Sequence, residues 1–358
     1  MLQKKYFLSY FLLIQIAIVK IIAFFPKWIE QFYSNGLYVF ISKNLRIVFG
    51  AVPFSVGDIL YGILIIYVIK SILKNRKILK SNWKNILFNS INFISIFYFL
   101  FHFLWAFNYY RVPLFEKMNI KKDYSEKDLI DFTESLIVRT NEIHFSITKN
   151  KKEKVVVPFT QTQLFEMTQN GYNNLTKVHP FFNYKIRSAK ISLFSSPLSY
   201  MGFSGYLNPF TNEAQVNNKV PKYGLPMTIC HEMAHQIGYA SESECNFIGF
   251  LAASKNDDLY FQYAANTMAL KYCLGIIKAK SESNNNKNIK QYLSKLNKGI
   301  LKNFQEDKDF NKNYQSFVEV GFKIFYDNFL KMNQQKEGLE SYSKFLNLLI
   351  NYEKTNSV

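Results

Sequence analysis

The sequence predicts an α+β protein, mostly α-helical, in which three N-terminal transmembrane helices precede a domain with a small sheet and an active-site helix. Three observations lead to this prediction. Long apolar stretches fill the first 108 residues, the chain then becomes amphipathic, and a turn-rich segment precedes the sequence "HEMAH" at 231–235. We therefore divide the chain into a membrane domain, residues 1–108, and a second domain, residues 109–358.

The membrane domain contains three candidate spans. The first is "YFLSYFLLIQIAIVKIIAFF" (6–25), and the second is "FSVGDILYGILIIYVIKSIL" (54–73), in which Asp58 and Lys70 lie near the edges. The third, "ILFNSINFISIFYFLFHFLWAF" (86–107), has no formal charge. Each has about the 20 apolar residues that cross a bilayer as a helix. For the second stretch, a buried helix of a soluble protein is the alternative.

The distribution of basic residues predicts which way the spans run. Six Lys or Arg residues and no acid lie between positions 70 and 84. Short loops rich in Lys and Arg stay in the cytoplasm, so this loop is expected there. Three spans then place everything after about residue 108 on the extracytoplasmic side. A miscounted second span would reverse this orientation.

Charge and cysteine content narrow the possible partners. The formal net charge is +18. Such a charge is typical of proteins that bind nucleic acid or an anionic membrane surface, and it also arises where a whole proteome is rich in Lys and Asn. No nucleic-acid recognition motif is found, so we expect membrane lipids and no nucleic acid as partners. The three cysteines, an odd number without a C-x-x-C pair, predict buried thiols and no disulfide framework.

The second domain changes its pattern along the chain. Ser125 and the acids that follow it indicate the start of a helix, and residues 160–177 suit a second helix. Ser, Gly, Pro and aromatic residues in 189–218 predict short strands and turns. Pro226 is placed to open a helix, further helices are expected to the end, and 281–288 reads as a polar loop.

The sequence "HEMAH" has the spacing of a zinc site. His231 and His235 are four residues apart, so on a helix both imidazoles face one cation. Glu232 lies beside them and can reach a metal-bound water, whose pKa zinc lowers towards about 7. The motif therefore predicts a Zn²⁺ site with Glu232 as the general base.

A catalytic zinc usually needs a third protein ligand. Gly238 is expected to adopt positive φ and turn the chain back, which presents two acids, Glu242 and Glu244. Ser241 and Glu244 fit a capping box, so we favour Glu242 as the ligand and keep Glu244 as the alternative. Asn246, four residues beyond Glu242, is expected to orient a ligand by a hydrogen bond.

Four stretches resemble the bacterial membrane proteins grouped as domain of unknown function 3810. They are "FNYYRVPL" (107–114), "MGFSGYLNPFTNEAQVN" (201–217), "LPMTICHEMAHQIGYASESECNFIGFLA" (225–252) and "NFLKMNQQKEGLESYSKFLNLL" (328–349). The family is similar to zincin metallopeptidases in its H-E-x-x-H helix, which implies a zincin-like second domain. The run from Glu242 to Asn246 resembles the E-x-x-x-D segment of gluzincins, with Asn for Asp. The spacer after His235 is closer to that of metzincins, whose third ligand would fall at Ser241.

These observations predict a membrane-anchored zinc metallopeptidase, a hydrolase in which Glu232 is catalytic and His231, His235 and Glu242 bind Zn²⁺. We expect a multi-pass protein of the bacterial inner membrane with its catalytic domain in the periplasm. We expect its substrate to be a peptide or a cell-envelope protein. A peptidoglycan cross-link and a membrane protein cut near the bilayer are the other candidates. The alternative is a catalytically silent scaffold or binding protein with a structural metal.

Two further features remain open at this stage. By analogy with zincins, the segment "GYLNPFTNEAQVN" (205–217) could form an edge strand beside the active-site helix, where an extended peptide adds as a strand. Tyr206, Tyr260 and Tyr263 are candidates for stabilising the oxyanion.

Overall fold

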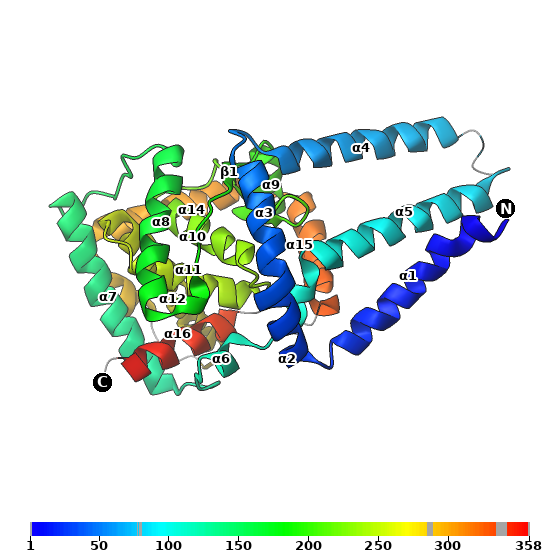
Figure 1. Ribbon diagram of the computed structural model, residues 1–358. Helices are drawn as coiled ribbons and strands as arrows, with labels where there is room; N and C mark the ends of the chain where they lie inside the picture. The colour runs from blue at the N-terminus through cyan, green and yellow to red at the C-terminus, as the bar shows by residue number, and fades with distance from the viewer. Residues whose placement is uncertain (1, 77, 79–80, 285–288, 334–341, 357–358) are drawn as a thin grey trace.

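The computed structural model describes residues 2–76, 78, 81–284, 289–333 and 342–356. Three long helices extend from one side of a helical body, and the body contains a small three-stranded sheet (Figure 1). The predicted class, mostly helical with a small sheet, is confirmed.

The elements follow one another in three groups. The N-terminal elements are α1 (Leu2–Ile22), α2 (Pro26–Trp28), the π-helix η1 (Ile29–Leu37), α3 (Tyr38–Gly50), α4 (Val56–Asn75) and α5 (Trp83–Leu104). The middle elements are η2 (Ala106–Tyr110), α6 (Leu114–Lys117), α7 (Glu126–Thr148), α8 (Gln161–Val178), η3 (Pro180–Phe182), β1 (Ala189–Ile191), α9 (Ser195–Met201), β2 (Gly205–Asn208) and β3 (Glu213–Val216). The last elements are η4 (Lys222–Gly224), α10 (Leu225–Gln236), α11 (Glu242–Ser254), α12 (Leu259–Asn284), α13 (Ile289–Ser294), α14 (Lys298–Tyr314), α15 (Phe317–Met332) and α16 (Tyr342–Asn356).

Two helices of the described chain, α4 and α5, are each long and apolar enough to cross a membrane. A third span results if the bent pair Phe7–Ile22 and Pro26–Gly50, which turns by 96°, counts as one. The predicted second and third spans thus correspond to α4 and α5. In Figure 1 the start of α1, the end of α4 and the start of α5 lie far from the body.

Helix α1 packs along α5 through polar contacts inside an apolar interface. The amide Nε2 of Gln15 donates to Oγ of Ser95 at 2.9 Å, and Ser9 Oγ donates to Asn92 Oδ1 at 2.8 Å. Polar side chains that bond across two helices satisfy groups that lipid cannot. These bonds join α1 to α5, and in Figure 1 α4 runs on the other side of α5 from α1.

The segment between the first two predicted spans forms helices that the sequence analysis did not foresee. Residues 29–50 make η1 and α3, which lie across the body (Figure 1). The hydroxyl of Tyr38 donates to the carbonyl of Gln236 at 3.1 Å, although 198 positions separate the two residues. This segment therefore belongs to the packing of the second domain.

The sheet has the strand order β1-β3-β2, with β1 parallel and β2 antiparallel to β3. Gly205 pairs with Val216, and Asn208 pairs with Glu213. The central strand β3 is buried throughout, β2 lies at an edge, and α10 packs against both. The strands predicted in 189–218 are confirmed, and the same segment also contains the helix α9.

Most of the predicted helices are present. Ser125 and Asp128 form a capping box at the start of α7, and Thr160 caps α8. The predicted polar loop 281–288 is wrong over its first half, because α12 continues to Asn284; residues 285–288 lie outside the described residues. The three cysteines are free and buried, as expected.

Two buried carboxylates join the start of α4 to the sheet. Glu213 of β3 accepts hydrogen bonds from two backbone N–H groups of the first turn of α4, at 3.2 and 2.6 Å. Asp58, in the same turn, accepts from the backbone N–H of Leu193 at 2.6 Å and from the hydroxyl of Tyr206. Carboxylates stabilise a helix start because the first N–H groups have no partner within the helix.

We predict that Glu213→Ala destabilises this junction. The substitution leaves two buried N–H groups without an acceptor, which costs about 2–4 kcal/mol. The midpoint temperature of thermal unfolding, measured on the purified protein in detergent, should fall by about 5 °C. Glu166→Ala is the matched control, since the side chain of Glu166 is 61% exposed and should leave the midpoint unchanged. Equal midpoints for Glu213→Ala and the wild type would contradict the assignment.

Candidate metal centre

The two histidines of the motif lie on α10, and the chain reverses direction directly after this helix. Gly238 has φ of 89°, as predicted, and ends the turn that leads into α11. A Cβ at this position would lie 2.9 Å from the Tyr38 ring and 3.0 Å from Oδ1 of Asn108. A side chain is therefore excluded by space as well as by backbone conformation.

Helix α11 returns against α10 at close range. A Cβ on Gly249 of α11 would lie 2.9 Å from the backbone nitrogen of His231 and 2.8 Å from Cε of Met227. Glycine at this position lets the two backbones approach each other. As a result, the first turn of α11 lies opposite the histidines.

His231, His235 and Glu242 form a group that could hold a metal ion, because one ligand atom from each lies within 4.8 Å of the others. The carboxylate Oε2 of Glu242 is 3.2 Å from Nε2 of His231 and 3.8 Å from Nε2 of His235. Burial raises the pKa of Glu242, but the hydrogen bonds and charges of the two imidazoles outweigh it and hold this pKa well below its usual value. These three residues, which we call the metal-ligand group, combine two nitrogen donors with one oxygen donor, and this combination suits zinc.

A hydrogen bond at Nδ1, the ring nitrogen that faces away from Glu242, fixes the orientation of each imidazole. Nδ1 of His231 is 2.9 Å from Oδ1 of Asn246, and Nδ1 of His235 is 2.8 Å from the carbonyl oxygen of Tyr239. Both partners are acceptors, so each Nδ1 carries a proton, and Nε2 is the nitrogen of each ring that would bind a metal ion. Asn246 also donates to the hydroxyl of Tyr272 at 3.1 Å, which orients its amide. Asn246 thus holds the position expected from the sequence.

Glu244, the alternative third ligand, points elsewhere. Its carboxylate accepts the backbone N–H of Leu114 at 2.6 Å. The capping box predicted for Ser241 and Glu244 is wrong: Ser241 caps no N–H group, and its hydroxyl bonds Ser243 at 3.0 Å. Glu244 therefore joins α11 to the start of α6, and Glu242 alone of the two acids faces the histidines.

Glu232 lies between the metal-ligand group and the edge strand β2. A Cβ on Gly205 would lie 2.6 Å from Oε1 of Glu232, so glycine makes room for the carboxylate. Within the described part of the chain, Oε2 of Glu232 is buried without a hydrogen-bond partner. Burial raises the pKa of Glu232 to about 7, although the charges of the nearby imidazoles lower it. The carboxylate is thus able to accept and release a proton near neutral pH.

Sequence reasoning missed Tyr326 of α15. Its hydroxyl donates to Oε1 of Glu242 at 2.6 Å, across 84 positions of the chain. This bond leaves Oε2, the oxygen that faces the histidines, as the atom available to a metal. No local motif marks Tyr326, which lies two residues before one of the stretches that carry the family resemblance.

The tyrosines proposed from the sequence make contacts elsewhere. The hydroxyl of Tyr206 donates to Asp58, and that of Tyr263 donates to Oδ1 of Asn303 at 2.9 Å. Tyr260 packs edge-on against the ring of Phe159. Their proposed role as oxyanion donors therefore has no support in the geometry.

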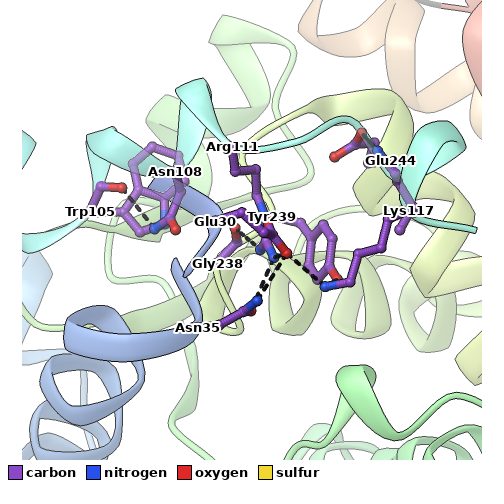
Figure 2. A network of polar contacts seen from close by, with 10 residues as sticks. Glu30, Asn35, Trp105, Asn108, Arg111, Lys117, Gly238, Tyr239 and Glu244 are labelled. Carbon is purple, nitrogen blue, oxygen red and sulfur yellow. Dashed lines mark hydrogen bonds and ion pairs between the residues drawn. The ribbon is translucent and has the colours of Figure 1, made fainter. Parts of the chain in front are cut away.

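A buried ion pair holds the turn between α10 and α11 (Figure 2). Arg111 donates to both carboxylate oxygens of Glu30, at 2.7 and 2.8 Å, and to the carbonyl of Gly238 at 2.6 Å. Its guanidinium also lies 4.1 Å from the ring centre of Tyr239, and Lys117 donates to Glu30 at 2.8 Å. Because the carbonyl of Tyr239 orients His235, this network fixes a metal-ligand candidate from the N-terminal segment.

The first prediction for this site concerns metal affinity. Wild-type protein prepared without chelators should bind about one zinc ion per chain. His231→Ala and Glu242→Ala each remove a ligand and should weaken binding about 100-fold or more, as measured by titration calorimetry and elemental analysis. Glu244→Gln is the matched control, because glutamine still accepts the N–H of Leu114 and should leave affinity unchanged. Loss of zinc in the control with retention in Glu242→Ala would reverse the ligand assignment.

The second prediction concerns the orientation of His231. Asn246→Ala removes the acceptor of its Nδ1 proton and should weaken zinc binding about 10- to 100-fold. Asn246→Asp keeps an acceptor in the same place and should stay within a few-fold of the wild type. Titration of both variants with zinc separates the two cases. Identical affinities for the alanine and aspartate variants would argue against the hydrogen bond as the orienting contact.

Comparison with known proteins gives a family and no further relative. No curated protein and no solved structure matches the chain. One family model matches residues 33–350, which include the described metal-ligand group, Arg111 and both α4 and α5; Glu30, the partner of Arg111, precedes the matched range. The chain therefore belongs to the family described as "Protein of unknown function (DUF3810)".

Proposed function

We propose that this protein is a membrane-anchored zinc metallopeptidase. The observation that carries the proposal is the arrangement of Glu232 beside His231, His235 and Glu242. A structural zinc site usually has four protein ligands, whereas a catalytic site has three and a neighbouring acid or base. The described group has three ligands, and the unpartnered oxygen of Glu232 lies next to it.

The mechanism follows from the positions of these side chains. A zinc ion held by His231, His235 and Glu242 would polarise a scissile carbonyl and lower the pKa of an attacking water. Glu232 would take the proton from that water and pass it to the leaving amine, which is general base and then general acid catalysis. Tyr326 holds the carboxylate of Glu242 in place during these steps.

The environment of Glu232 supports this role over a structural one. A buried carboxylate oxygen without a hydrogen-bond partner lowers stability. Oε2 of Glu232 is in this state, while Oε1 faces Gly205, where any side chain would collide with it. Such a position is explained if the carboxylate acts on a substrate or a water at the metal.

The arrangement of α10 and the sheet also supports the zincin-like domain expected from the sequence. Helix α10 packs on β2 and β3, and β2 is an edge strand beside Glu232. An extended peptide added to β2 would run past the base and the metal ligands. This placement favours peptide bonds as the substrate of the site.

Charge placement supports an extracytoplasmic site. The basic loop between α4 and α5 is expected in the cytoplasm. In Figure 1 the end of α4 and the start of α5, which this loop joins, lie away from the body, so the body would lie on the opposite, periplasmic side of a bacterial inner membrane.

The decisive experiment tests the catalytic role of Glu232 separately from the zinc-binding role of the three ligands. Glu232→Gln keeps all three ligands and should retain zinc, while cleavage falls about 10²- to 10⁴-fold. Cleavage is measured by mass spectrometry on a mixed library of soluble and membrane-anchored peptides in proteoliposomes. Glu244→Gln is the control and should cleave like the wild type. If zinc-loaded wild type and Glu232→Gln behave identically here and in cells, the alternative gains support: a catalytically silent scaffold with a structural metal.

A further inference from the structure

We infer that the substrate is a polypeptide anchored in the same bilayer and cut within a few residues of the membrane surface. The inference rests on the proposed peptidase function and adds the class of substrate. It follows from where the metal-ligand group and the edge strand lie relative to the ends of α4 and α5.

The helix that carries the histidines contacts the end of a membrane-spanning helix. Trp105, the residue directly after α5, donates its indole N–H to the carbonyl of His235 at 3.3 Å. The centres of their two rings are 6.0 Å apart. The 22 residues of α5 extend over about 33 Å, roughly the thickness of the hydrocarbon core. His235 therefore lies at the level where α5 leaves the hydrocarbon.

The edge strand β2 runs from the site towards the membrane helices. Its first residue, Gly205, contacts Glu232, and the next, Tyr206, stacks on Tyr61 of α4 at 6.2 Å. Phe210, in the turn after β2, lies 4.9 Å from the ring centre of Phe97 on α5.

These contacts place the ring of Phe210 below the ends of the spans, whereas Asn208 and Thr211, on either side of it, meet Gly57 in the first turn of α4. Phe97 lies seven residues before Leu104, the last residue of α5, which corresponds to a depth of about 10 Å. Tyr61 of α4, five residues after Val56, also contacts Phe210, at 6.3 Å, and corresponds to about 8 Å. The β2–β3 turn thus lies at the ends of the spans, and the ring of Phe210 reaches the hydrocarbon level between α4 and α5.

A chain that pairs with β2 would therefore connect the site with the bilayer. The distance from Gly205 to Asn208 is about 10 Å for an extended strand. A substrate strand would have its scissile bond beside Glu232 and would reach the membrane surface about five residues later. A transmembrane segment that follows a short extended stretch satisfies this geometry.

Helix α15 places exposed apolar side chains beside the site, near the end of α5. Phe329 contacts Phe101 of α5 at 6.0 Å between ring centres, so α15 lies beside the end of this span. Ile324 and Phe325 on its outer face are 61% and 63% exposed, while Tyr326 of the same turn bonds Glu242. An amphipathic helix in this position suits the headgroup region of a bilayer.

Buried contacts fix the height of the site above the membrane. The start of α4 is bonded to the sheet by Glu213, and the turn after α10 is bonded by Arg111 to Glu30. The site is thus attached directly to the spans, and no flexible linker of the described chain lies between them. Peptide bonds far from the bilayer surface are out of its reach unless the chain that contains them comes to the membrane.

The test uses three libraries that share one random segment of about 20 residues. In the first library, the random segment directly follows a transmembrane helix. In the second, a rigid helical spacer of about 20 residues, or 30 Å, separates the transmembrane helix from the random segment. The third library has no transmembrane helix and is soluble. Each library is co-reconstituted in nanodiscs, or mixed with nanodiscs, that contain the zinc-loaded wild type. Mass spectrometry maps the cuts, with Glu232→Gln as the background.

The first library should be cut at least 10-fold more than the other two, mostly within about ten residues of the helix. The spacer library controls for the effect of anchoring on local concentration. Equal cleavage of the direct and spacer libraries, or of the soluble one, overturns the inference and leaves the peptidase proposal standing. No cleavage of any library by zinc-loaded protein overturns the peptidase proposal and the inference with it.

Discussion

The approach of one carboxylate to two imidazoles is the constraint on which the rest of the structure depends. Glu242 meets Nε2 of His231 and of His235 only because the chain reverses between α10 and α11 and the two helices then lie close together. Gly238 permits the reversal and Gly249 permits the close approach. A side chain at either glycine would move Glu242 away, so the site depends on backbone geometry as much as on its ligands.

The surrounding structure keeps this buried polar group in one arrangement. Every polar atom of the two imidazoles and of Glu242 that does not face the centre has a partner, supplied by Asn246, Tyr239 and Tyr326. Asn246 lies in α11, Tyr239 lies in the turn before it, and Tyr326 lies in α15, whose Phe329 contacts Phe101 of α5. Buried polar groups are stable when all of their hydrogen bonds are made, and such networks also select a single conformation.

The sequence predicted the parts of this site that local spacing determines. The four-residue interval of His231 and His235, the turn at Gly238 and the preference for Glu242 could all be read from neighbouring residues. The capping box at Ser241 was wrong because the sequence did not show that Glu244 would meet a backbone N–H 130 positions away. Tyr326, the ion pair of Glu30 and Arg111, and the helices of 29–50 were missed for the same reason: tertiary contacts make them, and no periodic pattern marks them.

The N-terminal helices, two of which are long and apolar enough to cross a membrane, form part of the framework of the metal-ligand group. The carbonyl of His235 accepts from Trp105, at the end of α5, and the next carbonyl accepts from Tyr38, in the segment before α4. The last turn of a helix leaves its carbonyls without partners inside the helix. The carbonyl of His235 also accepts the N–H of Gly238 at 3.0 Å, so Trp105 adds a second donor there, whereas Tyr38 supplies a donor for the carbonyl of Gln236. A fragment that begins after α5 would lack Trp105, Tyr38 and Glu30, so the geometry of the metal-ligand group depends on the elements that precede residue 106.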